Sequence, residues 1–347
     1  MLRNDEYKFL YYKERLKGLM DEKIIPPVTV EIGLTTRCTD RCNFCAFDWM
    51  MGDKVDLDFE SLKKAVDDMS YLKVRGISIC GNGEPLLYKN FVELVDYIAS
   101  KNIQIGLVTN GSLIHKMKDD IDIFKKFTYV RVSLDAGDET TYKKVHGTKN
   151  FLNVLEGLKM LVAVSTEQNT IGVHYTLSMD NYDSMYRSLK ICRDIGVDYF
   201  HIGPIVKSTQ NTEGIPNPHL LKDIEIKALE NQSRKGFQIF VSRNRFDDVA
   251  GLDVTTAGFN KCRAQNFFTI IEANGNVAPC CHLVSNPIYT FGNINERSFK
   301  DIWYGKDRAY IMNHINFKDC SQSCNKKSAN RLLHSLFYPS MHPAFLG

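Results

Sequence analysis

Two hydrophobic patterns alternate along residues 26–205 of the chain. Short runs rich in β-branched and aromatic residues predict strands, and the stretches between them place apolar residues at helical spacing. The predicted strands are 28–33, 76–80, 103–109, 129–134, 170–177 and 199–204, and the clearest predicted helices are 59–72, 90–101 and 153–164. Such alternation indicates βαβ units and a parallel sheet. Because six strands are too few for a closed eight-stranded barrel, we expect an α/β fold with a partial (β/α)6 TIM-like barrel.

The pattern changes beyond this region. Residues 208–219 carry glycine and two prolines and predict a connecting loop, which a helix over 220–234 and an apolar run at 237–242 follow. Two short strands around Asn274–Gly275 predict a type I′ hairpin, and 298–315 predicts a helix. We therefore divide the chain into an N-terminal helical segment (1–25), a barrel core (26–215), a connecting region (216–260), a small Cys-rich domain (261–335) and a tail (336–347).

Composition narrows the class of protein. The chain has 347 residues and a formal net charge of +3, too weak a charge to indicate a nucleic-acid partner. No apolar run approaches the ~20 residues of a membrane span. The N-terminal segment is too charged for a secretory signal, so we expect a cytoplasmic protein. In a reducing compartment, ten cysteines indicate metal ligands or catalytic groups and not disulfides.

Three of these cysteines follow the first predicted strand. Cys38, Cys42 and Cys45 are separated by three residues and then by two, so one loop can wrap three thiolates around a cubic iron–sulfur cluster. Such clusters are normally held by four cysteines, so three leave one iron open to a small ligand. The alternative is a zinc knuckle that borrows a fourth ligand from elsewhere.

The loop resembles the CxxxCxΦC signature of the radical S-adenosylmethionine (SAM) enzymes, with Phe44 at the aromatic position. The second strand ends in a segment similar to the motif that holds the SAM amino group, formed here by Gly81, Asn82, Gly83, Glu84 and Pro85. The third ends in VTNG, which contains Asn110, and the fourth leads to Ser133 and Asp135, which the resemblance places at or near the SAM ribose. All lie at carboxyl ends of predicted parallel strands, where chemistry gathers in such folds.

One position departs from the family pattern. Many relatives have arginine before the glycine of the last segment, where this chain has His146. Arginine gives a permanent bidentate fork for a carboxylate, whereas histidine offers fewer donors and can be neutral near pH 7. His146 is therefore one candidate partner for the SAM carboxylate, and Lys143 or Lys144 is another.

Five further cysteines lie in the last quarter of the chain, at 262, 280, 281, 320 and 324. Four thiolates can ligate a second cluster fully, which then carries electrons and does not bind SAM. The surrounding sequence resembles the SPASM/Twitch auxiliary domains of radical SAM enzymes. No cysteine follows Cys324, so we expect the shorter form, with one auxiliary [4Fe–4S] cluster on Cys262, Cys280, Cys320 and Cys324. Cys281 remains an alternative to Cys280, and a four-cysteine zinc site is the alternative chemistry.

The resemblance implies a radical SAM oxidoreductase or a related radical-based modifying enzyme. A [4Fe–4S] cluster with SAM at its open iron is reduced by an external donor such as flavodoxin or ferredoxin. SAM is then cleaved to methionine and a 5′-deoxyadenosyl radical, which takes a hydrogen atom from the substrate. The cofactor supplies the difficult step and the protein orients it.

The first substrate hypothesis is a sugar or aminocyclitol that is oxidised at a carbinol carbon, with the auxiliary cluster accepting the second electron. A base must then remove the hydroxyl proton. His174 is our candidate, with Tyr175 and His201 as further possibilities at strand ends. Histidines at such positions are more often structural than catalytic.

The second hypothesis is a maturase of a ribosomally made peptide that forms a thioether crosslink or an epimer. Epimerisation needs a thiol that returns a hydrogen atom, and Cys80 and Cys281 are candidates, although a buried structural role is expected for Cys80 and for Cys192. Many such relatives carry a leader-binding domain, whereas about 25 residues precede the first strand here. The third hypothesis is a non-catalytic zinc-binding module.

Overall fold

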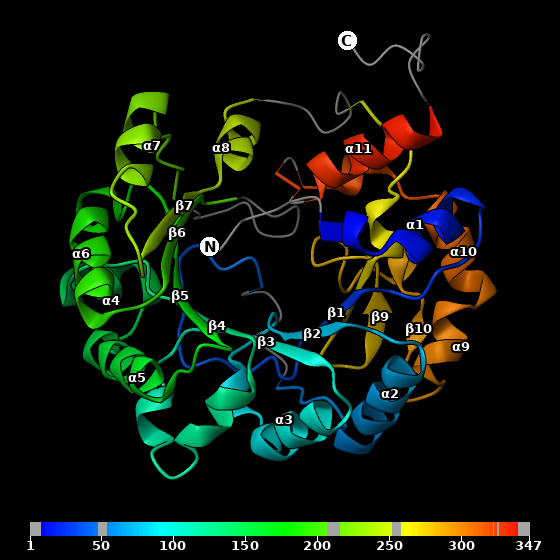
Figure 1. Ribbon diagram of the computed structural model, residues 1–347, viewed down its shortest axis with the longest axis horizontal. Helices are drawn as coiled ribbons and strands as arrows, with labels where there is room; N and C mark the ends of the chain where they lie inside the picture. The colour runs from blue at the N-terminus through cyan, green and yellow to red at the C-terminus, as the bar shows by residue number, and fades with distance from the viewer. Residues whose placement is uncertain are drawn as a thin grey trace.

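The computed structural model describes residues 8–47, 54–206, 216–251, 258–321, 323–324 and 326–338. Its centre is one curved sheet of ten strands in the order β10-β9-β8-β1-β2-β3-β4-β5-β6-β7 (Figure 1). The six predicted strands are confirmed as β1 (Thr29–Ile32), β2 (Gly76–Ile79), β3 (Gln104–Thr109), β4 (Tyr129–Ser133), β5 (Thr170–Leu177) and β6 (Tyr199–Pro204). They pair in parallel throughout, which confirms the α/β class.

Two further parallel strands extend the predicted six. β7 (Gln238–Val241) forms from the apolar run and pairs with β6. β8 (Phe268–Ile271) comes from the Cys-rich region and pairs in parallel with β1 on the other side. The Cys-rich region thus shares the sheet of the core. β7 and β8 are the outer strands of this parallel set and do not pair with each other, so the barrel stays open, as expected.

Helices cover the convex face of the sheet (Figure 1). α2 (Phe59–Tyr71), α3 (Phe91–Ser100), α5 (Phe151–Val164) and α6 (Met185–Ile195) bury apolar stripes against strands whose outward residues, such as Val30 and Ile32, are fully buried. α4 (Glu139–His146) and α7 (Asp223–Glu230) continue this layer, whereas α8 (Arg243–Val249) contacts β6 and lies inside the ring of outer helices (Figure 1). α7 is shorter than the helix expected over 220–234, and most of the loop expected at 208–219 lies outside the described residues. No helix in the described ranges is long and apolar enough to cross a membrane.

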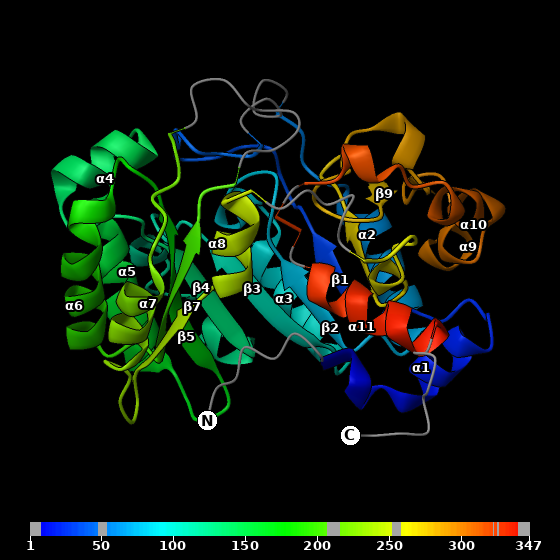
Figure 2. The same cartoon turned by 90° about the horizontal axis from the view of Figure 1, so that it is seen from above.

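The two ends of the described chain meet. The N-terminal segment forms a 3-10 turn (Lys8–Tyr11) and α1 (Lys13–Met20), and α1 lies beside α11 (Lys327–Phe337) in both views (Figures 1 and 2). Phe9 and Leu19 share a small apolar cluster with Leu333. The indole N–H of the buried Trp303 also donates to the carbonyl of Ile25 at 2.7 Å. The Cys-rich region is therefore fixed to the start of the core.

Two local predictions were wrong. The hairpin between β8 and β9 (Asn276–Ala278) is not type I′, because among the residues around this turn only Gly275 has a positive φ, of 90°. The N–H of Gly275 donates to the carbonyl of Glu272 at 2.9 Å, which gives a longer turn closed by a left-handed glycine. The helix expected at 298–315 is two helices, α9 (Phe299–Trp303) and α10 (Lys306–Asn313), because Gly305 adopts the extended backbone that begins α10.

Candidate active site and metal centres

The loop that follows β1 presents three cysteines at the carboxyl edge of the sheet. Cys38, Cys42 and Cys45 are all partly accessible. The loop rests on the end of α4, where the N–H of Arg41 donates to the carbonyl of His146 and the N–H of Asn43 to that of Val145, both at 2.9 Å. Gly147 makes this contact possible, because a Cβ there would lie 2.7 Å from the carbonyl oxygen of Arg41.

His146 lies beneath this loop and not on the wall of the cavity described below. Its Nδ1 is 3.2 Å from the Cys42 Sγ and 3.2 Å from an Asp40 oxygen, and its Nε2 is 3.2 Å from an Asp135 oxygen. Burial disfavours the charged ring, but Cys42, Asp135 and Asp40 outweigh it and raise the pKa of His146. Both ring nitrogens therefore already face protein groups, so the expected contact with a SAM carboxylate does not fit this position.

Asp135 is likewise drawn into the protein. It is fully buried, its backbone has a positive φ of 49°, and its carboxylate accepts from the backbone N–H of Thr176. It therefore holds β4 to β5 and pairs with His146, instead of facing a ribose. Ser133 keeps the expected place at the end of β4, where it stands opposite His174 of β5.

The glycine-rich segment after β2 packs closely on the cysteine loop. A Cβ on Gly83 would lie 2.2 Å from the carbonyl oxygen of Arg37 and 2.7 Å from that of Thr35. Gly81 has a φ of 94°, which favours glycine. Asn82 is buried at the same place, where its side chain fills the space beside Gly33. A larger side chain at Gly83 would prevent the backbone of this segment from approaching the cysteine loop so closely.

Glu84 joins three loops at this edge. Its buried carboxylate accepts hydrogen bonds from the Thr109 hydroxyl at 2.6 Å and the Asn110 N–H at 2.8 Å. It also accepts from the Leu86 N–H at 3.1 Å, at the start of the 3-10 turn that Pro85 begins. Burial raises the pKa of Glu84 to about 7. Asn110 in turn donates to the Thr39 hydroxyl at 2.7 Å and points toward the Cys38 Sγ at 3.8 Å. The motifs after β2 and β3 thus position the cysteine loop.

The C-terminal cysteines form a second group. Burial raises the pKa of the Cys262, Cys280, Cys320 and Cys324 thiols, and nearby thiols of the same group add to the effect for Cys262, Cys280 and Cys320. The Asn330 amide donates to the Cys262 Sγ at 3.4 Å, and the Lys326 N–H donates to the Cys324 Sγ at the same distance. Cys324 thus acts on the thiols of Cys262, Cys280 and Cys320, which indicates that the four lie in one region.

Cys281 lies beside this group and also near β1. After burial, Glu31 and then Cys324 raise the pKa of its thiol, whereas Lys326 and Arg245 lower it. Glu31 also forms a hydrogen bond with Cys80, and burial raises the pKa values of both groups. Cys80 and Cys281 therefore lie near the same inward-facing carboxyl of β1. Cys192 is fully buried on α6 in the main core, as expected.

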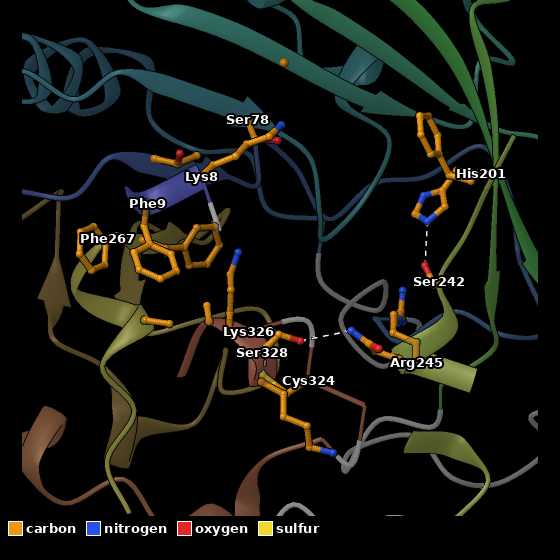
Figure 3. A pocket seen from close by; sticks show the side chains of 18 of the residues that line it. Lys8, Phe9, Ser78, His201, Ser242, Arg245, Phe267, Cys324, Lys326 and Ser328 are labelled. Carbon is orange, nitrogen blue, oxygen red and sulfur yellow. Dashed lines mark hydrogen bonds between the residues drawn. The ribbon is translucent and has the colours of Figure 1, made fainter. Parts of the chain in front are cut away.

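The concave side of the sheet encloses a cavity of about 1120 Å³ (Figure 3). Strand residues such as Ser78, Arg131, His174 and His201 form its wall, and Cys324 of the second cysteine group also lines it. Figure 3 shows His201 and Ser242 on one side, with Lys326 and Cys324 across from them. His174 connects the cavity to the other motifs, because its neighbour across β4–β5 is Ser133.

The two cavity histidines are neutral bases. Their ring centroids are 4.9 Å apart, and the His201 Nε2 is 2.7 Å from the Ser242 hydroxyl. Burial, followed by the charges of Arg131 and Arg245, lowers the pKa of His201 to about 3, and burial and His201 lower that of His174. The His174 Nδ1 has no hydrogen-bond partner among the described residues. Tyr175, by contrast, is buried and donates to the carbonyl of Asn181, so it takes no part in the cavity.

Sequence reasoning missed the polar side chains within the strands. Glu31, Arg131 and Ser78 interrupt runs that otherwise consist of apolar residues. A charged residue in the middle of a buried parallel strand is the signal that could have found them, because such strands are normally apolar on both faces.

Comparison with known proteins agrees with this geometry. Residues 32–192 match the radical SAM superfamily, and residues 262–326 match an iron–sulfur cluster-binding domain. A tungsten-containing aldehyde ferredoxin oxidoreductase cofactor-modifying protein of Pyrococcus furiosus is 21% identical over 290 residues, which cover 78% of this chain and 79% of that protein. Mycofactocin maturase MftC of Mycobacterium tuberculosis is 22% identical, with 83% and 73% covered.

Solved structures show the same fold. Streptococcus suis SuiB bound to S-adenosylmethionine superimposes with a TM-score of 0.67 at 17% identity, covering 90% of this chain and 74% of SuiB. SuiB bound to its precursor peptide SuiA superimposes with a TM-score of 0.68 at 16% identity, covering 91% of this chain and 73% of SuiB.

This chain therefore belongs to the radical SAM superfamily and carries a C-terminal iron–sulfur domain of the SPASM type. It is an enzyme that uses S-adenosylmethionine, a [4Fe–4S] cluster and auxiliary iron–sulfur chemistry. The hypothesis of a non-catalytic zinc-binding module no longer stands.

Proposed function

We propose that Cys38, Cys42 and Cys45 hold the SAM-binding cluster, and that Cys262, Cys280, Cys320 and Cys324 hold the auxiliary cluster. The first set fits because its thiols are accessible on one loop and N–H groups of Asn110 and Phe47 already point at Cys38 and Cys45. The second set is supported by Cys324, which raises the pKa values of the Cys262, Cys280 and Cys320 thiols. Cys324 also raises the pKa of Cys281, but Glu31 has the larger effect there. The segments Gly81–Pro85 and Asn110, together with Ser133, are the proposed SAM contacts.

Bound at these positions, the two clusters and SAM would supply the chemistry of the family, which comprises reductive SAM cleavage, hydrogen abstraction from a substrate and acceptance of an electron. An external one-electron donor such as flavodoxin or ferredoxin would provide the reducing electron. The protein contributes binding, orientation and proton transfer.

The substrate we propose is a small polar molecule of the sugar or aminocyclitol type, oxidised in the central cavity. The observation that carries this proposal is that one cavity reaches both His174, next to Ser133, and Cys324. A substrate there would lie directly against Cys324 of the proposed auxiliary cluster site. Its hydroxyl groups find partners in Ser78, Ser242 and His201, and the free Nδ1 of His174 is a neutral base that can accept a hydroxyl proton.

A second candidate is the modification of a peptide. It is supported by the precursor-peptide complex of SuiB and by the maturase MftC, both similar to this chain. Cys281 and Cys80, near Glu31, supply thiols that could return a hydrogen atom in an epimerisation.

The test is anaerobic incubation of reconstituted enzyme with SAM and dithionite, in the presence of sugars, aminosugars and aminocyclitols in one arm and short synthetic peptides in the other. Mass spectrometry follows 5′-deoxyadenosine and substrate mass. We expect a two-hydrogen loss from a member of the first arm, which Cys320→Ala abolishes while SAM cleavage continues. Modification confined to peptides would favour the second candidate and contradict the first.

A further inference from the structure

Two arginines face the cavity from different elements. Arg131 extends from the middle of β4 and Arg245 from α8, and both line the cavity. Burial lowers the pKa of the Arg245 guanidinium. Among the nearby groups, Cys281 and Cys324 raise this pKa and the charge of Arg131 lowers it. The two cations are therefore close enough to repel each other across a space that excludes much of the solvent.

Most nearby carboxylates are already paired with other cations. Glu230 forms an ion pair with Arg243, and Asp248 forms one with Lys327. Two carboxyls remain. Asp247 lines the cavity and is exposed, and Glu31, whose pKa burial raises, is influenced by the charges of Lys326 and Arg131. Among the described residues, the Arg131 Nε has no hydrogen-bond partner. The Nε–H of Arg245 donates to the Ser323 hydroxyl at 3.4 Å.

The polar groups converge on one point of the wall. A Cβ built on Gly203 of β6 would lie 3.2 Å from the His174 Cε1 and 3.6 Å from both the Arg245 Nη1 and the Ser242 Oγ. Glycine leaves this volume open. The His174 Nδ1 lacks a partner in the described part of the chain, and its ring and the Arg245 guanidinium border the same small space.

We propose that the substrate carries an anionic group, a carboxylate or a phosphate, that binds beside Gly203 between Arg131 and Arg245. This inference deepens the proposed function and rests on it for the cavity being the substrate site. Arginine is suited to the role because its planar fork donates two parallel hydrogen bonds to either anion. His174 and Ser242 then orient the rest of the molecule, with the reacting carbon toward Ser133.

The test measures thermal unfolding midpoints of the reconstituted enzyme without SAM. Inorganic phosphate and acetate are titrated separately, each against sodium chloride at equal ionic strength. We expect a saturable rise of the midpoint with at least one anion. The rise should be lost in Arg131→Gln, reduced in Arg131→Lys, and retained in Arg234→Gln, which removes an exposed arginine that does not line the cavity. The anion with the lower half-saturating concentration identifies the substrate as phosphorylated or carboxylic.

Equal responses of the wild type and Arg131→Gln would overturn the proposal, because they would indicate the general stabilisation that excluded salts produce. No rise above chloride with either anion would overturn it as well. Formation of 5′-deoxyadenosine is measured in parallel. If the wild type binds anions but does not cleave SAM, the proposed function fails and the anion site stands. If the enzyme cleaves SAM but the wild type binds neither anion, the anion site fails and the proposed function stands.

Discussion

The His146 Nδ1 lies 3.2 Å from the Sγ of Cys42. The same ring lies between the buried carboxylates of Asp40 and Asp135. Asp40 also accepts hydrogen bonds from Tyr142, Thr148 and Asn150. One side chain thus links the cysteine loop, the end of β4 and α4, which gives it a positioning role in this chain.

His146→Ala should destabilise the cysteine loop. It leaves Asp40 and Asp135 buried without a counter-charge, a situation that typically costs about 3 kcal/mol or more. We expect a lower free energy of unfolding and a loss of about half of the bound iron, measured by denaturation and iron analysis under anoxic conditions. His115→Ala, which removes a histidine outside this network, is the control. Unchanged iron content in His146→Ala would contradict the positioning role.

The contact between the glycine-rich segment and the cysteine loop predicts a second effect. Gly83→Ala places a Cβ against two backbone oxygens, so the loops must move apart, at a cost of about 1–3 kcal/mol. Gly81→Ala is a matched control, because its Cβ meets no atom within 4 Å and only its positive φ causes strain. We expect SAM binding, measured by isothermal titration, to weaken far more in Gly83→Ala. Equal weakening of SAM binding in the two variants would contradict this, because backbone strain alone would then explain both.

The two adjacent cysteines should differ in iron content. Cys262 and Cys324 both raise the pKa of the Cys280 thiol, whereas Glu31 affects the Cys281 thiol more than Cys324 does. Reconstituted wild type should hold about eight iron atoms, as expected for two [4Fe–4S] clusters. Cys280→Ala should retain about half of them and Cys281→Ala nearly all. If Cys281→Ala lost half of the iron and Cys280→Ala kept nearly all of it, Cys281 and not Cys280 would be the ligand.

Glu84 predicts a pH dependence of stability. Its pKa is raised by burial from 4.5 to about 7, so the folded state binds the proton more tightly than the unfolded state does. The stabilisation is complete below pH 4.5 and is lost as the pH rises to about 7. Between about pH 5 and about pH 8, the free energy of unfolding of wild type should therefore fall by about 2 kcal/mol relative to Glu84→Gln. The free energies of unfolding come from anaerobic denaturation at each pH. If those of wild type and Glu84→Gln changed in parallel with pH, the raised pKa of Glu84 would be contradicted.

The sequence was most informative where chemistry and local pattern coincide. Six strands and the cysteine loop could be predicted because each depends on residues close together in the chain. The pairing of β8 with β1 could not, since it joins Thr29 to Phe268 and no local pattern encodes that register. The burial of His146 depends on Asp40 and Asp135, which meet only in the folded protein. Arg131 was overlooked because strand periodicity does not tell which face encloses a cavity.

The central claim is that Cys38, Cys42 and Cys45 leave one iron open to SAM. The most direct measurement is 5′-deoxyadenosine formed by anaerobically reconstituted protein with SAM and dithionite. We predict that the wild type and Cys192→Ala, which removes a buried core thiol, form it, and that Cys42→Ala does not. Undiminished formation in Cys42→Ala, or zinc in place of iron in anoxically purified wild type, would contradict the account.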